Sequence, residues 1–241
     1  FSLFTVTLRC NQNVMGLTLT TFGIGAYTLI YEMITKAKLP VDNGVLSNYC
    51  RQFYTIFPPE TFSNNAVADL FLNHGLLWFL SFVIGIVAAI ILKKTRVGLS
   101  LRAVGENAAS ADAAGISISK YRYLATIIGC AIAALGGLYY LLEMKIGLME
   151  FNELDGFGWL AVALVIFTLW KTDIGVLGAM LFAFLYKLPA VYKISNNALN
   201  ILFSYLPYLV TIVILVIISL FDKVGSQAPH DLGISYFRED R

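Results

Sequence analysis

The stretch GLLWFLSFVIGIVAAIIL, residues 75–92, decides the fold class because its eighteen residues include no Asp, Glu, Lys or Arg. A helix needs about 20 residues to cross roughly 30 Å of hydrocarbon. Inside lipid the backbone must satisfy its own hydrogen bonds, as a helix does. Three more uncharged stretches have comparable length: Val14–Tyr31, Tyr123–Leu142 and Ile201–Phe221. The sequence therefore predicts an all-α fold, a polytopic transmembrane helical bundle.

Two shorter apolar runs, Gly156–Trp170 and Ile174–Tyr186, are separated by three residues. We interpret them as a tight hairpin of two crossing helices that extend a few residues beyond the runs; a re-entrant pair is the alternative. The count is then about six spans. The opening FSLFTVTL, residues 1–8, is typical of the end of an earlier span. We expect residues 1–241 to form a single, N-terminally truncated transmembrane domain.

The composition excludes several functional classes. Of the 241 residues, 58% are hydrophobic and only 13% are charged, against about 25% charged in soluble domains. A nucleic-acid-binding protein would carry a basic stripe on a polar domain, which this sequence lacks. Its cysteines and histidines are far apart, so we expect neither a disulfide framework nor a metal site. No nucleophile–base arrangement is visible, and we expect no enzymatic activity.

The distribution of basic residues predicts the orientation. Residues 93–122 carry six Lys or Arg against two acids, whereas residues 143–155 carry four acids and one Lys. These segments flank the same span, so the basic one is expected in the cytoplasm. Alternation then places the tail, residues 222–241, inside as well, together with 11 of the 17 basic residues. Residues 32–74 become a long external loop, either a cap over a pathway or a plain connector.

The segment 93–122 also contains an Ala-rich stretch between glycines. We predict a short helix from about Ala108 to Ala114, with Asn107 as N-cap and Gly115 as its C-terminal stop. Such a helix is too polar to insert into lipid, and two spans would hold it below the bilayer. It could serve as a lever for a soluble partner, or it could be an ordinary structured loop.

The run LRAVGENAASADAAGI, residues 101–116, resembles the cytoplasmic-loop signature of ABC-importer permeases of the ribose, nucleoside and branched-chain amino acid superfamily. The resemblance covers nearly the whole chain. RCNQNVMGL, residues 9–17, is similar to the entry of a middle helix, and GWLAVALVIF, residues 158–167, to the hairpin segment. LGISYFREDR, residues 232–241, resembles the C-terminus of the nucleoside branch in Gram-positive bacteria.

The resemblance implies a multi-pass permease subunit of the bacterial cell membrane that imports nucleosides or simple sugars. It implies no cofactor of its own, because a separate ATP-binding subunit would use ATP. Further partners would be a second permease subunit, identical or not, and an extracytoplasmic substrate-binding protein. Residues 93–122 would be the coupling loop. Its candidate contact residues for the ATP-binding subunit are Arg102, Gly105, Glu106, Asn107, Asp112 and Gly115.

Other interpretations remain open at this stage. A branched-chain amino acid or ribose permease belongs to the same superfamily, and a membrane scaffold or enzyme could share the topology alone. The uncharged spans favour a neutral solute, because proton and ion carriers need ionisable groups at membrane depth. Within the spans, Gly129, Ala133 and Gly137 recur on one helix face and are expected at helix contacts. Pro207 is expected to kink the last span.

Overall fold

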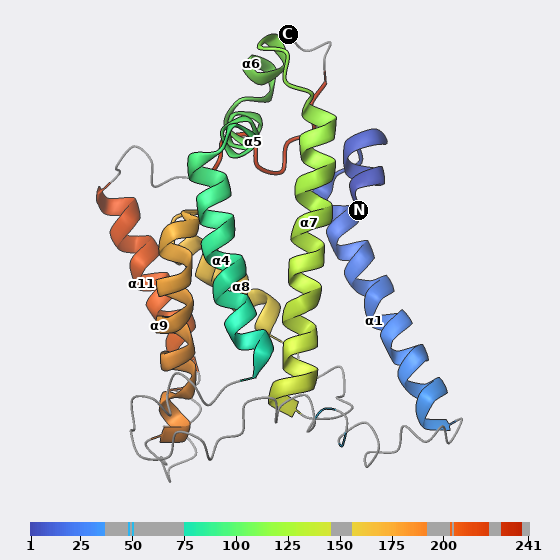
Figure 1. Cartoon of the computed structure of the whole chain (residues 1–241), viewed down its shortest axis with the longest axis vertical. Coiled ribbons are helices and arrows are strands. Elements are labelled where there is room, and N and C mark those ends of the chain that lie inside the picture. Colours follow the sequence, from blue (N-terminus) through green and yellow to red (C-terminus); the bar gives the residue numbers. More distant parts are fainter. Residues whose placement is uncertain are drawn as a thin grey trace. The chain divides into compact units, whose positions relative to one another are not determined.

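The computed structural model describes residues 1–36, 48, 50, 75–145, 156–191, 203, 205–221 and 228–237. Every regular element in these residues is a helix, which confirms the predicted fold class (Figure 1). The chain divides into two compact units. The first comprises Phe1–Ile84, Asn107–Glu153 and Gly233–Arg241, and the second Gly85–Glu106 and Leu154–Leu232.

Among the described residues, three helices are long and apolar enough to cross a membrane. They are α1 (Gln12–Lys36), α4 (Leu76–Lys94), and α7 (Ile118–Tyr139) together with the π-helix η3 (Tyr140–Lys145) that continues it. None of their most apolar windows is buried within the chain. Large side chains such as Leu17 and Phe22 stand about 70% and 71% exposed. An apolar surface of this kind suits lipid and neighbouring helices rather than water.

Polar side chains on α1 are satisfied within the helix itself. The hydroxyls of Thr18, Thr20 and Thr28 each donate to the carbonyl four residues earlier, at 2.8, 2.9 and 2.9 Å. This internal pairing removes the cost of placing a hydroxyl in hydrocarbon. A span rich in threonine can therefore remain a membrane helix.

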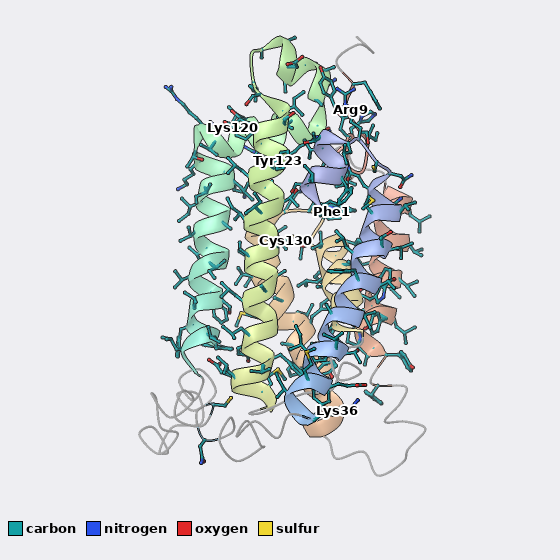
Figure 2. The ribbon with its side chains drawn as sticks, turned by 90° about the vertical axis from the view of Figure 1, so that its right-hand side faces the viewer. Phe1, Arg9, Lys36, Lys120, Tyr123 and Cys130 are labelled. Atoms are coloured by element: carbon teal, nitrogen blue, oxygen red, sulfur yellow. The ribbon has the colours of Figure 1, made fainter. Side chains whose placement is uncertain are left out.

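Within the first unit, the structure shows which ends of the helices lie on the same side. Figure 2 shows Arg9 and Lys120 at one end of this unit and Lys36 at the other. At the start of the unit, the π-helix η1 (Leu3–Thr7) contacts α7, where Thr7 and Tyr123 share a hydrogen bond between their hydroxyls. Arg9 and the first turn of α7 therefore lie on the same side of the spans.

At the far end of the same unit, Glu143 links η3 to the first turn of α4. Its Oε1 accepts a hydrogen bond from the backbone N–H of Leu77 over 2.8 Å, and its side chain is buried. A carboxylate satisfies an N–H that has no partner in the first helical turn. The beginning of α4 and the end of α7 are therefore tied together.

The second unit contains α8 (Phe157–Phe167), α9 (Thr172–Val191) and α11 (Leu206–Phe221), which pack against one another (Figure 1). The Tyr208 hydroxyl donates to the Gly156 carbonyl over 3.2 Å, joining the starts of α11 and α8. At the other end of α8 the rings of Phe167 and Phe182 meet edge to face at 5.1 Å. The predicted hairpin is thus formed by α8 and α9.

The hairpin differs from our expectation in the length of its first helix. We expected both helices to extend beyond the apolar runs, but α8 has 11 residues, roughly 16 Å, about half of the hydrocarbon thickness. It ends because Leu169 and Trp170 adopt left-handed conformations, each with φ of 55°. The Trp170 N–H then bonds the Val165 carbonyl at 3.1 Å and closes the helix end.

The expected kink at Pro207 is also not formed. Helix α11 begins at Leu206, so Pro207 lies in its first turn. There the missing N–H of proline costs nothing, since no carbonyl of the same helix would accept it. The residue is fully buried and starts the helix instead of bending it.

Candidate functional site: the polar helices between α4 and α7

The short helix predicted in the polar segment is present as α6 (Ala108–Ala113). The Asn107 side chain accepts a hydrogen bond from the Ser110 N–H at 2.8 Å, which confirms it as the N-cap. Ala114 caps the other end, and Gly115 follows with φ of +82°. That conformation suits glycine, because a Cβ is strained there. The chain then reverses through the bond from the Ile116 N–H to the Ala111 carbonyl.

A second polar helix precedes α6, and sequence reasoning missed it. A single residue, Thr95, separates helix α5 (Arg96–Glu106) from the end of α4. The Thr95 hydroxyl accepts from the Gly98 N–H at 3.1 Å and so caps the new helix. Gly98 packs on the last turn of α4 so closely that a Cβ there would lie 2.2 Å from the Ile91 carbonyl oxygen. This close approach positions α5 against the end of α4.

The six candidate residues fall into two groups of three. Helix α5 carries Arg102 and Glu106, both exposed, and the half-buried Gly105. The second group surrounds α6: Asn107 is its cap, the half-buried Asp112 lies in its last turn, and Gly115 is its exposed stop. Gly105 in the first group and Asp112 in the second group contact the C-terminal tail.

In the first unit, residues 233–237 of the tail make three contacts. The Tyr236 hydroxyl donates to Oδ2 of Asp112 over 2.9 Å. Nη1 of Arg122, in the first turns of α7, donates to the Ile234 carbonyl at 2.9 Å. The Arg9 guanidinium lies 4.9 Å from the centre of the Phe237 ring, within cation–π range. None of these tail residues was among the candidates.

In the second unit, residues 229–231 of the tail contact α5. The Asp231 N–H donates to the Gly105 carbonyl at 3.0 Å. A Cβ placed on Gly105 would lie 3.8 Å from Cβ of Pro229, an ordinary van der Waals distance. The Gly105 carbonyl is in the last turn of α5, where carbonyls have no partner within the helix. The tail supplies the missing donor.

Charged groups near the hairpin turn form an ion pair in the second unit. Nζ of Lys93, at the end of α4, lies 2.6 Å from Oδ2 of Asp173, at the start of α9. Both side chains are substantially exposed, and pairs of this kind contribute little to stability. The pair nevertheless places the α8–α9 turn beside the end of α4. Within the described ranges, no group of three or more His, Cys, Asp or Glu side chains could hold a metal ion.

These features together define a class: a polytopic helical membrane protein with a structured polar segment between two spans. Residues 1–218 match the family described as "Branched-chain amino acid transport system / permease component". The chain belongs to this family of permeases, which are transport subunits rather than enzymes. No solved structure shows a significant match to the chain.

Three of the relatives whose names state a transport role cover most of the chain. The chain is 31% identical to the nucleoside ABC transporter permease protein NupC of Lactococcus lactis over 70% of its length. It is 27% identical to the guanosine ABC transporter permease protein NupQ of Bacillus subtilis over 98%, and 30% identical to the putative glucose ABC transporter permease protein TsgC13 of Haloferax volcanii over 75%. The matches span 52%, 72% and 52% of these relatives, respectively.

Proposed function

We propose that this chain is the membrane-spanning permease subunit of an ATP-driven importer for nucleosides or simple sugars. It forms the translocation pathway as one domain, residues 1–241. It works with an ATP-binding subunit, a second permease subunit, identical or not, and an extracytoplasmic substrate-binding protein. The binding protein delivers the solute, and ATP hydrolysis in the partner drives alternating access.

The observation that carries this proposal is helix α6. It is a short polar helix, capped by Asn107 and stopped before Gly115, and it lies between α5 and α7 in the chain, outside the apolar spans. An element of this kind can transmit force only if a protein outside the membrane binds to it. In a family of transport subunits that do not hydrolyse ATP themselves, the protein expected to bind this helix is the ATP-binding subunit.

Within this segment the six candidate residues take different roles. The exposed side chains of Arg102 and Glu106 on α5 are available to contact the ATP-binding subunit directly. Asn107 and Gly115 fix the two ends of α6. The remaining two, Gly105 and Asp112, act through their bonds to the tail.

The proposed solute class rests on two arguments. Relatives named for nucleoside, guanosine and glucose transport cover 70–98% of this chain. In addition, the apolar cores of the spans contain no Asp, Glu, Lys or Arg, which suits a path for an uncharged polar solute. The family description favours a second candidate, a branched-chain amino acid, and ribose remains the third.

We place the basic segment 93–122 and the C-terminus in the cytoplasm of a bacterial cell. Arg9 and Lys120 lie at the same end of the first unit, which supports this assignment (Figure 2). Glu143, the first residue of the acidic loop, bonds the start of α4, as expected if both ends face outside. The ion pair of Lys93 with Asp173 agrees with a hairpin turn on the inner side.

The test begins with affinity purification of the tagged chain from its native membranes and identification of the proteins that accompany it. The complex is then reconstituted in liposomes with ATP on the cytoplasmic side, and the uptake of guanosine, glucose, ribose and leucine is compared. We expect an ATP-binding subunit to copurify and guanosine or a sugar to be taken up. Uptake should persist when a protonophore collapses the proton gradient at constant ATP.

Leucine uptake alone would favour the branched-chain amino acid candidate. Loss of uptake with the protonophore would indicate a secondary carrier. Absence of any ATP-binding subunit from the purified complex would contradict the proposal and favour a membrane scaffold.

A further inference from the structure

The C-terminal tail contacts elements that are far from it in sequence. Within the first unit, residues 233–237 reach α6, the start of α7 and the turn before α1. The bonded pairs Tyr236–Asp112 and Arg122–Ile234 span 124 and 112 positions of sequence.

Helix α6 depends on outside contacts for its stability. It has six residues, far below the roughly 12–15 at which isolated helices begin to persist in water. Its buried side chains are the two alanines Ala108 and Ala111, which bury little apolar area. Asn107 stabilises its first turn, but local capping does not fix the position of the helix relative to α7.

The bond from Tyr236 to Asp112 supplies such a positional restraint. It is a charge-assisted hydrogen bond to the last turn of α6, and it is partly buried. Bonds of this kind are shorter and stronger than neutral ones. The tail is in turn bound to α7 through Arg122 and to the turn before α1 through Arg9. Asp112 is therefore connected through the tail to the membrane-embedded helices.

We propose that residues 233–237 are a clamp that positions α6, with Tyr236 as its positioning residue. This inference rests on the proposed function, in which α6 is gripped by the ATP-binding subunit. The clamp makes α6 move together with α7 instead of sliding or unfolding when the partner pulls on it. Tyr236 contributes to coupling through Asp112.

The test uses the full chain in its complex with the ATP-binding subunit, in lipid nanodiscs. Tyr236→Phe removes the donor and keeps the ring, so folding should be preserved. Tyr121→Phe, at the start of α7 and outside the clamp, is the matched control. Asp112→Asn keeps an oxygen acceptor for Tyr236, whereas Asp112→Ala removes it.

The first measurement is hydrogen exchange of the α6 amides. Exchange reports local opening, and loss of one charge-assisted bond should accelerate it by roughly tenfold or more. We expect this acceleration in Tyr236→Phe and Asp112→Ala, little change in Asp112→Asn, and none in Tyr121→Phe. The double variant Tyr236→Phe with Asp112→Ala should exchange no faster than Asp112→Ala alone, because the bond from Tyr236 is already lost in that single variant.

The second measurement is the ratio of ATP hydrolysed to solute transported. A loosened α6 should raise this ratio in Tyr236→Phe and in Asp112→Ala, whereas the ratio in Asp112→Asn should stay near the wild-type value. Unchanged exchange in Tyr236→Phe would overturn the clamp, whatever the ATP-binding subunit does. Faster exchange with an unchanged ratio would overturn its role in coupling.

Failure of the proposed function would be seen earlier and separately. In that case no ATP-binding subunit would accompany the wild-type chain, before any variant is made, and the role of the clamp in coupling would fall with it.

Discussion

The Tyr236 hydroxyl donates a hydrogen bond to the Asp112 carboxylate over 2.9 Å, across 124 positions of sequence. This bond distinguishes Asp112 from Glu106, the other acid of the polar segment. Asp112 is half-buried and bonded within the chain, whereas Glu106 is exposed at the end of α5. Glu106 is therefore the better probe of a partner surface, because its side chain makes no hydrogen bond or ion pair with the described part of the tail, residues 228–237.

The first prediction concerns Glu106. Charge reversal by Glu106→Arg should leave the fold intact and weaken retention of the ATP-binding subunit by about tenfold or more, as expected when like charges meet at an interface. Retention is measured by quantifying the copurified subunit at several salt concentrations. Ser110→Ala, on the exposed side of α6, is the control and should bind normally. Equal retention by Glu106→Arg and wild type would remove Glu106 from the interface.

The second prediction uses two glycines of α5. In Gly98→Ala the new Cβ would lie 2.2 Å from the Ile91 carbonyl oxygen and 2.5 Å from Cα of Leu92, both backbone atoms. We expect a loss of about 1–3 kcal/mol of stability from such overpacking. In Gly105→Ala the nearest atom outside the helix backbone is 3.8 Å away, and alanine favours the helix by up to about 1 kcal/mol.

The two variants are compared by thermal unfolding in the same detergent. Gly98→Ala should unfold at a lower temperature than wild type, and Gly105→Ala at the same or a higher temperature. The reverse order would mean that the corner between α4 and α5 is not closely packed.

Structural features that are set by neighbouring residues could be predicted from the sequence. The long spans were predictable because an uncharged run of 18 or more residues has few alternatives to a membrane helix. Helix α6 was predictable because its cap, Asn107, and its stop, Gly115, lie next to it in the chain. Both patterns are local.

The features that were missed follow from three-dimensional geometry that no sequence pattern shows. The stability of α5 comes in part from Gly98 packing on α4, which no local pattern in RVGLSLRAVGE indicates. The early end of α8 requires left-handed φ angles at Leu169 and Trp170, although residues without glycine's freedom rarely adopt them. The bond of Asp112 to Tyr236 joins two sequence segments that carry no shared signature.

The third prediction tests the orientation. In a background lacking Cys10, Cys50 and Cys130, cysteines are introduced singly as Ser110→Cys, on α6, and Asn152→Cys, in the acidic loop. If the basic segment is cytoplasmic, an impermeant thiol reagent added to intact cells should label the second variant and not the first. After permeabilisation both should be labelled. Labelling of Ser110→Cys from outside would reverse the topology.

The last prediction concerns Glu143, whose Oε1 accepts from the Leu77 N–H at 2.8 Å at the start of α4. Glu143→Ala leaves a donor in that turn without this acceptor, and we expect a loss of about 1–3 kcal/mol. Glu143→Gln keeps an oxygen and should lose less. As a control, Glu32→Ala removes only an exposed pair with Lys36 on α1 and should leave the unfolding temperature nearly unchanged.

Gly75 supplies a sharper version of the same test. A Cβ on Gly75 would lie 2.3 Å from the Glu143 carboxyl carbon, so Gly75→Ala should displace the carboxylate and destabilise the protein by itself. Once Glu143→Ala has removed that carboxylate, the added methyl group has room. The double variant should therefore be hardly less stable than Glu143→Ala alone, a strong departure from additivity between residues in contact. Unfolding temperatures of the four proteins measure this coupling, and additive losses would show that Gly75 and Glu143 act independently.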